Sequence, residues 1–114
     1  MTRLSDHAYG RFAESLAAIA MRLRGFRVVG RNVRVGGREV DLLARRGGLL
    51  VVCEVKARRG SRFGSPAEAV GPHKQRRLRE AAEMLMANDP SVERVRFDVI
   101  AVSGLGIRHL PEAF

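Results

Sequence analysis

The apolar run from Leu49 to Cys53 is the feature that most constrains the fold of this chain. Leu-Leu-Val-Val-Cys shows no alternation of apolar and polar residues, so it predicts a strand that is buried on both faces. Such a strand needs elements packed on both sides of its sheet, which predicts the α/β class with a mixed central sheet flanked by helices. The strand nevertheless continues into Glu54 and Lys56, and these charges at a buried position need an explanation.

The remaining elements follow from apolar spacing and from turn residues. We expect a helix over residues 6–24, capped by Ser5 or Asp6, and a short helix that begins at the capping box Ser65-Pro66-Ala67-Glu68. A longer helix is expected from Gly71-Pro72 to about residue 87. Strands are expected at residues 26–35, 39–45, 49–56, 92–102 and 107–110.

Charge indicates the kind of partner. The 114 residues, which predict a single domain over 1–114, include 21 Lys and Arg against 12 Asp and Glu, and the net charge is +9. This excess favours a polyanion, with nucleic acid ahead of a membrane surface, although an arginine-rich composition alone is the alternative. No apolar stretch reaches the roughly 20 residues that a bilayer span needs. Cys53 is the only cysteine, so we expect no internal disulfide and a cytoplasmic protein.

The glycine pair Gly47-Gly48 predicts which residues of the hairpin face each other. If these two residues form the turn, the numbers of paired residues sum to 95, so Asp41 lies opposite Glu54 and Glu39 lies opposite Lys56. Side chains alternate along a strand, so all four would share one face. Three carboxylates and one lysine are therefore expected to converge at the open end of the hairpin.

Carboxylates held this close repel each other unless a cation or a proton lies between them. Oxygen ligands in such a cluster suit a hard divalent ion such as Mg²⁺. A lysine beside them can orient a metal-bound water, and the metal can polarise a phosphate. The pattern therefore favours metal-assisted phosphodiester hydrolysis. The alternative is a ladder of cross-strand salt bridges, which would leave Asp41 and Glu54 facing each other without neutralisation.

Five segments in order carry a family resemblance: GRFAE, EVDLLA, VCEVKAR, RFGSPAEAV with a following lysine, and RFDVIAV. Together they span Gly10 to Val102. The chain resembles the YraN-like family of small bacterial proteins, which look like endonucleases of the PD-(D/E)xK superfamily related to Holliday-junction resolvases. Val40 stands where the superfamily's proline would be, and Arg38 replaces the usual glycine of the family's Gly-Glu-Ile-Asp segment.

The resemblance implies a restriction-endonuclease-like αβββαβ core, a Mg²⁺ or Mn²⁺ cofactor and DNA as substrate. Asp41 and Glu54 would be metal ligands, together with the backbone carbonyl of Val55, and Lys56 would be the catalytic lysine. Glu14 matches the acid that completes the site in resolvase-like members, and its alternative is an exposed helix charge. Gln75 resembles a polar residue that some members place beside the site, whereas an exposed amide is the simpler interpretation.

Basic residues near these acids form a candidate DNA surface, since lysine and arginine contact phosphates without reading sequence. They fall in the loop after Lys56 and at the start of the long second helix, where a solvated helix face is the alternative. The residues are Arg58, Arg59, Arg62, Lys74, Arg76 and Arg77. Asp98 and His109 are expected to be structural.

The leading hypothesis is a Mg²⁺-dependent endonuclease acting on branched or structured DNA. A homodimer is compatible with it, because symmetric cutting of a junction needs two sites. A DNA-binding module without catalysis and a scaffold for an acidic protein are the two other hypotheses.

Overall fold

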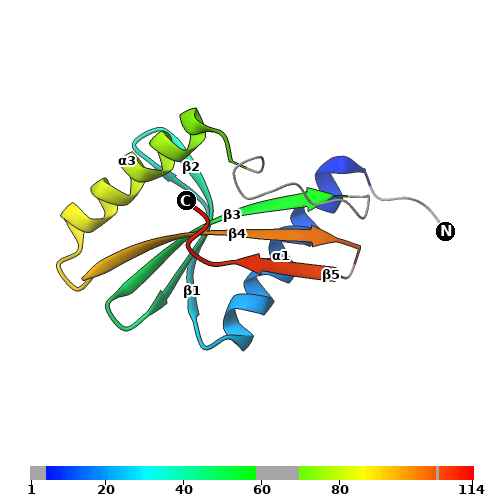
Figure 1. Cartoon of the computed structure of the whole chain (residues 1–114), viewed down its shortest axis with the longest axis horizontal. Coiled ribbons are helices and arrows are strands. Elements are labelled where there is room, and N and C mark those ends of the chain that lie inside the picture. Colours follow the sequence, from blue (N-terminus) through cyan, green and yellow to red (C-terminus); the bar gives the residue numbers. More distant parts are fainter. Residues whose placement is uncertain (1–4, 59–69, 105) are drawn as a thin grey trace.

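The computed structural model describes residues 5–58, 70–104 and 106–114, and Figure 1 shows how its elements are arranged. The expected capping box at residues 65–68, together with Arg59 and Arg62, lies outside the described residues. The elements, in chain order, are α1 (Asp6–Leu23), β1 (Arg27–Val35), β2 (Arg38–Arg46), β3 (Leu49–Arg58), α3 (Pro72–Asn88), β4 (Arg94–Ser103) and β5 (Gly106–Leu110).

The described strands form one mixed sheet in the order β1-β2-β3-β4-β5. β3 and β4 are parallel, with Cys53 opposite Asp98, and the other neighbouring pairs are antiparallel. The parallel connection runs through α3, as expected for strands that a hairpin cannot join. The α/β class with a mixed sheet is thus confirmed.

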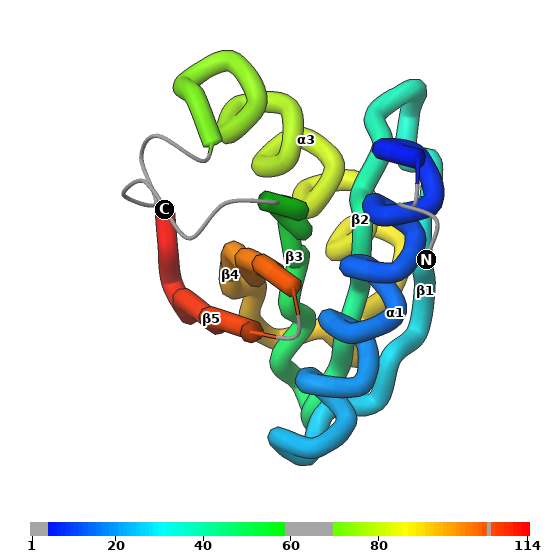
Figure 2. The backbone as a smooth tube through the Cα atoms, turned by 90° about the vertical axis from the view of Figure 1, so that its right-hand side faces the viewer, coloured from blue at the N-terminus to red at the C-terminus, as the bar shows by residue number. Residues whose placement is uncertain are grey.

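Two apolar cores lie on opposite faces of this sheet, which explains the apolar run in β3. Val51 and Cys53 pack against α1, whereas Leu50 and Val52 pack against α3. Figure 2 shows the two helices on the two sides of the strands. Because each fully buried valine or leucine contributes about 1.5–3 kcal/mol, β3 stabilises both layers at once. The prediction of a strand buried on both faces is confirmed.

Local signals set the ends of α1 and the turn of the β2–β3 hairpin. The Ser5 side chain accepts a hydrogen bond from the backbone N–H of Ala8 at 3.1 Å, and Gly25 follows the helix with φ of +88°. Left-handed backbone of this kind favours glycine after a helix. In the hairpin, the pairs run from Arg46–Leu49 to Leu42–Cys53, which confirms the two-residue turn.

Asp98 anchors the C-terminal part of the chain to the sheet. Its fully buried carboxylate accepts two hydrogen bonds from Arg96 at 2.9 Å and one from the backbone N–H of Glu112 at 3.1 Å, and it lies 2.6 Å from His109 Nε2. Burial alone would raise the pKa of Asp98, but the bonds from His109, Arg96 and Glu112 lower it overall. These contacts support the structural interpretation of Asp98 and the expectation that His109 packs.

Candidate functional site

Asp41 lies at an irregular point of β2. The β1–β2 ladder passes from Arg31–Leu42 to Val33–Val40, the β2–β3 ladder ends at Leu42–Cys53, and neither includes Asp41. Leu42 packs on the α1 side of the sheet, whereas Val40 and Leu43 both pack on the α3 side. Side-chain alternation is therefore broken at Asp41, next to a β1 strand in which Asn32 has a left-handed φ of +50°.

This irregularity corrects the predicted hairpin geometry. Instead of a backbone pair with Glu54, the Asp41 carboxylate accepts a hydrogen bond from the Val55 N–H at 2.9 Å. The expected pair of Glu39 and Lys56 is also missing from this ladder, and the Lys56 ammonium lies 3.6 Å from Glu54 Oε1. The arithmetic assumed an unbroken ladder with regular alternation, and the ladder stops one pair before Asp41.

Glu54 is the buried carboxylate at the centre of the site. It is only 2% exposed, and its Oε1 accepts a hydrogen bond from Lys74 of α3 at 2.6 Å. Its other oxygen, Oε2, is buried and has no hydrogen-bond partner among the described residues. A buried carboxylate oxygen without a donor is costly, so this atom marks a place where a cation or a donor from outside would be stabilising.

The electrostatics of Glu54 and Lys74 follow from this arrangement. Burial, followed by repulsion from Asp41, raises the pKa of Glu54, and the hydrogen bond from Lys74 offsets only part of the rise. For Lys74, burial opposes the charged form, but the hydrogen bond and the attraction of Glu54, helped by Asp41 and Glu39, raise its pKa overall. One ammonium thus lies in the field of three carboxylates.

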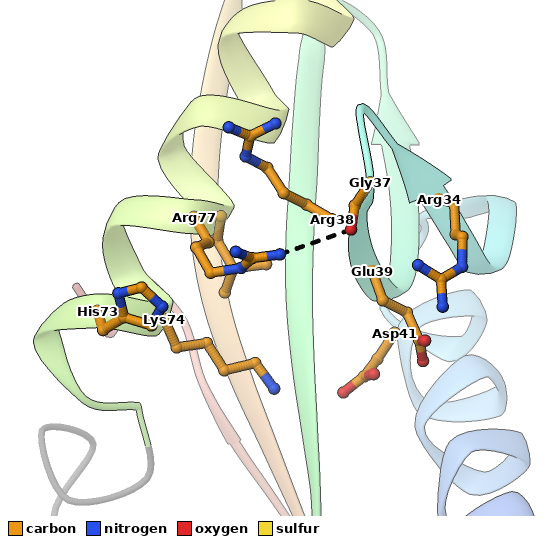
Figure 3. Close-up of a pocket in the computed structure, with 9 residues that line it drawn as sticks. Arg34, Gly37, Arg38, Glu39, Asp41, His73, Lys74 and Arg77 are labelled. Atoms are coloured by element: carbon orange, nitrogen blue, oxygen red, sulfur yellow. Dashed lines mark hydrogen bonds between the residues drawn. The ribbon is translucent and has the colours of Figure 1, made fainter.

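A cavity of about 480 Å³ opens between β2 and the start of α3, beside these groups. In Figure 3, Lys74 extends from α3 toward the Asp41 carboxylate, with Glu39 on the same side as Asp41. Basic side chains line much of the rest of the cavity. Its lining comprises Arg34, Gly37, Arg38, Glu39, Asp41, His73, Lys74, Arg77 and Leu78. A space that combines two acids with many cations can accept an anion alongside a metal ion.

Glu14 lies in a neighbouring cavity of about 440 Å³, which also contains Glu39 and Asn32. Its carboxylate accepts a hydrogen bond from the Asn32 side chain at 3.0 Å. Within the described ranges, no three His, Cys, Asp or Glu side chains gather closely enough to hold a metal ion. Glu39, Asp41 and Glu54 thus all act on the Lys74 ammonium, but they do not gather closely enough to hold one metal ion together. Glu39 lines both cavities, so it lies between the cavity that contains Asp41 and the cavity that contains Glu14.

The other predicted residues fall around this centre. The Gln75 side chain donates to the Val70 carbonyl at 2.8 Å, so it fixes the backbone just before α3. The Arg58 carbonyl accepts a hydrogen bond from the Tyr9 hydroxyl at 2.8 Å. Arg76 and Arg77 are exposed on α3, and Arg77 donates to the Gly37 carbonyl at 3.5 Å.

A family model described as uncharacterised protein family UPF0102 matches residues 13–102. The chain belongs to the UPF0102 family. A UPF0102 protein of Rhodococcus jostii is 47% identical over 113 residues, which cover 94% of this chain and 96% of that protein. One from Frankia alni is 41% identical over 120 residues and covers all of both chains. One from Syntrophotalea carbinolica is 41% identical over 111 residues, or 92% of this chain and 89% of that protein. The YraN-like family resemblance is confirmed.

The donor set of this UPF0102 chain fits a hard divalent ion with few protein ligands. Two carboxylates come from adjacent strands, and one of their oxygens, Glu54 Oε2, is buried without a donor in the described part of the chain. Mg²⁺ is commonly held by one or two carboxylates while it keeps several waters, so three acids are not required. Across the same described residues, no helix is long and apolar enough to cross a membrane.

Sequence reasoning missed two residues of this UPF0102 site. Lys74 was assigned to a DNA surface, whereas its ammonium contacts Glu54. Lys74 lies in the first turn of α3, which contains no acidic residue. Positive charge is unfavourable at a helix N-terminus, so this position indicates an acidic partner outside the helix. Asn32 is the second residue, and its type is a weak signal for the break beside Asp41, because asparagine tolerates left-handed backbone better than most residues do.

Proposed function

We propose that this UPF0102 protein is a metal-dependent DNA endonuclease of the PD-(D/E)xK type. The observation that carries the proposal is the pair of carboxylates on adjacent strands, one of them buried with an unsatisfied oxygen and flanked by two lysines. The chain's charge of +9 and the basic lining of the adjacent cavity suit a polyanionic substrate. Branched or structured DNA is the substrate that the resolvase-like resemblance favours, and the protein would then act in the cytoplasm.

In this proposal Asp41 and Glu54 hold Mg²⁺ or Mn²⁺ with help from the Val55 carbonyl. Such an ion lowers the pKa of a bound water and polarises the scissile phosphate. The Val55 N–H fixes one Asp41 oxygen, which orients the carboxylate. The Lys56 ammonium, in a side chain that is 29% exposed, can offset negative charge on the phosphate. Hydrolysis joins the water oxygen to phosphorus and breaks the bond to the leaving sugar oxygen, which takes a proton.

The remaining predicted residues would act around this centre. Glu14 and Glu39 line the neighbouring cavity and would help to position the water or the strand beside it. Gln75 supports the start of α3 through its bond to Val70. Arg58, Arg76 and Arg77 would contact phosphates and supply affinity without sequence choice. Two copies would be needed to cut both strands of a junction symmetrically, so a homodimer is part of the proposal.

Cleavage of labelled junction, flap and duplex DNA, with Mg²⁺ and with EDTA, tests the proposal. We expect Mg²⁺-dependent products, and a loss of about 10²–10⁴-fold in rate for Asp41→Asn, Glu54→Gln and Lys56→Met, as for removal of positioned catalytic groups. Glu83→Gln, which changes an exposed carboxylate on α3, is the matched control and should cleave normally. Full activity in Asp41→Asn and Glu54→Gln would refute a metal site at these residues.

A DNA-binding module without catalysis is the second candidate, because no three acidic side chains of the described residues gather closely enough to hold a metal ion. It predicts no turnover on any substrate but strongly salt-dependent binding. The slope of log affinity against log salt should fall by about one for each of Arg76→Ala and Arg77→Ala if these residues contact phosphates. Equal binding to heparin and DNA would instead favour an acidic protein partner.

A further inference from the structure

The start of α3 carries an unfavourable charge pattern that helix formation does not explain. Lys74 lies in the first turn, close to His73, Arg76 and Arg77, and this turn contains no acidic residue. The helix is preceded by Gly71, which makes no side-chain capping bond. Positive charge at a helix N-terminus opposes the macrodipole, typically by about 0.3–1 kcal/mol for each charge. An interaction outside the helix must therefore offset this cost.

Glu54 supplies that interaction for Lys74. The Lys74 ammonium lies 2.6 Å from Glu54 Oε1, whereas the Lys56 ammonium lies 3.6 Å from the same oxygen. The Lys74 side chain is 45% exposed, while that of Glu54 is 3% exposed. The flexible, partly exposed Lys74 side chain therefore neutralises the Glu54 carboxylate, which has almost no contact with solvent. Since only Oε1 is bonded, the neutralisation is incomplete.

The space that Lys74 reaches is also the space that suits a divalent ion. Figure 3 shows Lys74 crossing the cavity toward Asp41 and Glu39 on the opposite wall. A metal ion held by Asp41 and Glu54 would lie close to the ammonium that now contacts Glu54. The positive charges of the metal ion and of the Lys74 ammonium would repel each other there. The metal and Lys74 therefore compete for the Glu54 carboxylate.

We propose that Lys74 is a tethered counter-cation that weakens metal binding until a DNA phosphate draws its ammonium away from Glu54. The inference rests on the proposed function, because it assumes a metal ion at Asp41 and Glu54. A phosphate in the cavity offers Lys74 a solvent-accessible anion, and the freed Glu54 carboxylate then binds the metal more tightly. Binding of DNA and binding of metal are thereby coupled, and by linkage each strengthens the other by the same factor.

Metal affinity without DNA is the first test. Mn²⁺ binding to the full chain, followed by the electron paramagnetic resonance signal of free Mn²⁺, is measured for wild type, Lys74→Met, Lys74→Gln and Lys74→Arg. We expect the Met and Gln variants to bind Mn²⁺ about tenfold more tightly, equivalent to about 1.4 kcal/mol. The Arg variant, which keeps the charge, should bind as wild type does.

The controls separate competition at Glu54 from a change in overall charge or in folding. Arg22→Met removes the same charge from an exposed position of α1, and its effect should stay below about threefold because salt screens surface charges. Lys74→Gln can still donate a hydrogen bond to Glu54, so it keeps the test valid if the Met variant unfolds. Circular dichroism checks the fold of each variant.

The coupling itself is measured as junction-DNA affinity by fluorescence anisotropy, with and without Ca²⁺ at constant ionic strength. Ca²⁺ should strengthen binding to wild type, and Lys74→Met should lose most of this gain. If Glu54→Gln abolishes Mn²⁺ binding but Lys74→Met and Lys74→Gln leave it unchanged or weaken it, the Lys74 proposal alone is refuted. If neither wild type nor Lys74→Met binds Mn²⁺, the proposed metal site is refuted as well.

Discussion

Glu54→Met should stabilise the protein at neutral pH while it removes the proposed metal ligand. In the wild type, Glu54 Oε2 is buried without a partner in the described residues, and such a group costs about 1–3 kcal/mol. The substitution loses the ion pair with Lys74, but the Lys74 side chain is 45% exposed and its ammonium can return to water, so the loss is about 1 kcal/mol. We therefore expect a net change of about 0–2 kcal/mol in the free energy of unfolding, in the stabilising direction.

The gain should depend on pH in a direction that the pKa shift sets. Because burial raises the pKa of Glu54 in the folded state, the stability that its protonated form contributes is lost as pH rises through the folded pKa. Methionine does not titrate. The advantage of the variant is therefore greatest above the folded pKa of Glu54, and it disappears as acidification protonates the wild-type carboxyl.

Urea unfolding followed by circular dichroism between pH 4 and pH 8 measures the effect, and thermal unfolding gives a second estimate of roughly 4 °C for each kcal/mol. Glu83→Met, at an exposed position of α3, should stay within about 0.5 kcal/mol of wild type. A loss of about 3–5 kcal/mol in Glu54→Met would refute the reasoning, because a deficit of that size identifies Glu54 as half of a structural buried ion pair.

Two further predictions concern residues that support the site. Asp98→Ala should lose about 3–5 kcal/mol in urea unfolding, because it leaves the partly buried Arg96 and His109 side chains without their carboxylate. Since the pKa of Asp98 is lowered, its contribution is present above its ordinary pKa and fades as pH falls through the folded value, so a deficit independent of pH would contradict this assignment. Asn32→Ala should lose about 1–2 kcal/mol through left-handed backbone strain. Asn32→Gly should recover most of that loss in the same measurement, and equal stability of the two variants would exclude backbone strain as the cause.

The sequence was sufficient for the parts of the fold that depend on local rules. Gly47-Gly48 determined the hairpin register as far as Leu42–Cys53, and the unbroken apolar run of β3 predicted cores on both faces. Both inferences depend only on turn chemistry and on which residues can be buried. Neither needs the position of an element that is distant in the chain.

The site was predicted less well because its geometry depends on non-local contacts. Whether β2 keeps regular alternation at Asp41 depends on its pairing with β1 as well as with β3, and the left-handed Asn32 stands opposite the break. The reach of Lys74 to Glu54 depends on how α3 packs over the sheet, which helical periodicity does not give. Glu14 was placed near Asp41 by resemblance, and its hydrogen bond to Asn32 holds it in the adjoining cavity instead.

The unusual chemistry of Glu54 follows from the same burial that stabilises the fold. β3 supports both apolar layers, so the end of this strand stays buried even where a carboxylate replaces an apolar side chain. Burial raises the pKa of that carboxylate and leaves one oxygen without a donor in the described chain. Neutralisation comes instead from two lysines, whose ammonium groups lie 2.6 Å (Lys74) and 3.6 Å (Lys56) from Glu54 Oε1. In a less buried strand, water would solvate both carboxylate oxygens and so lower the cost of the charge, but it would also compete with the metal ion that we propose for this site.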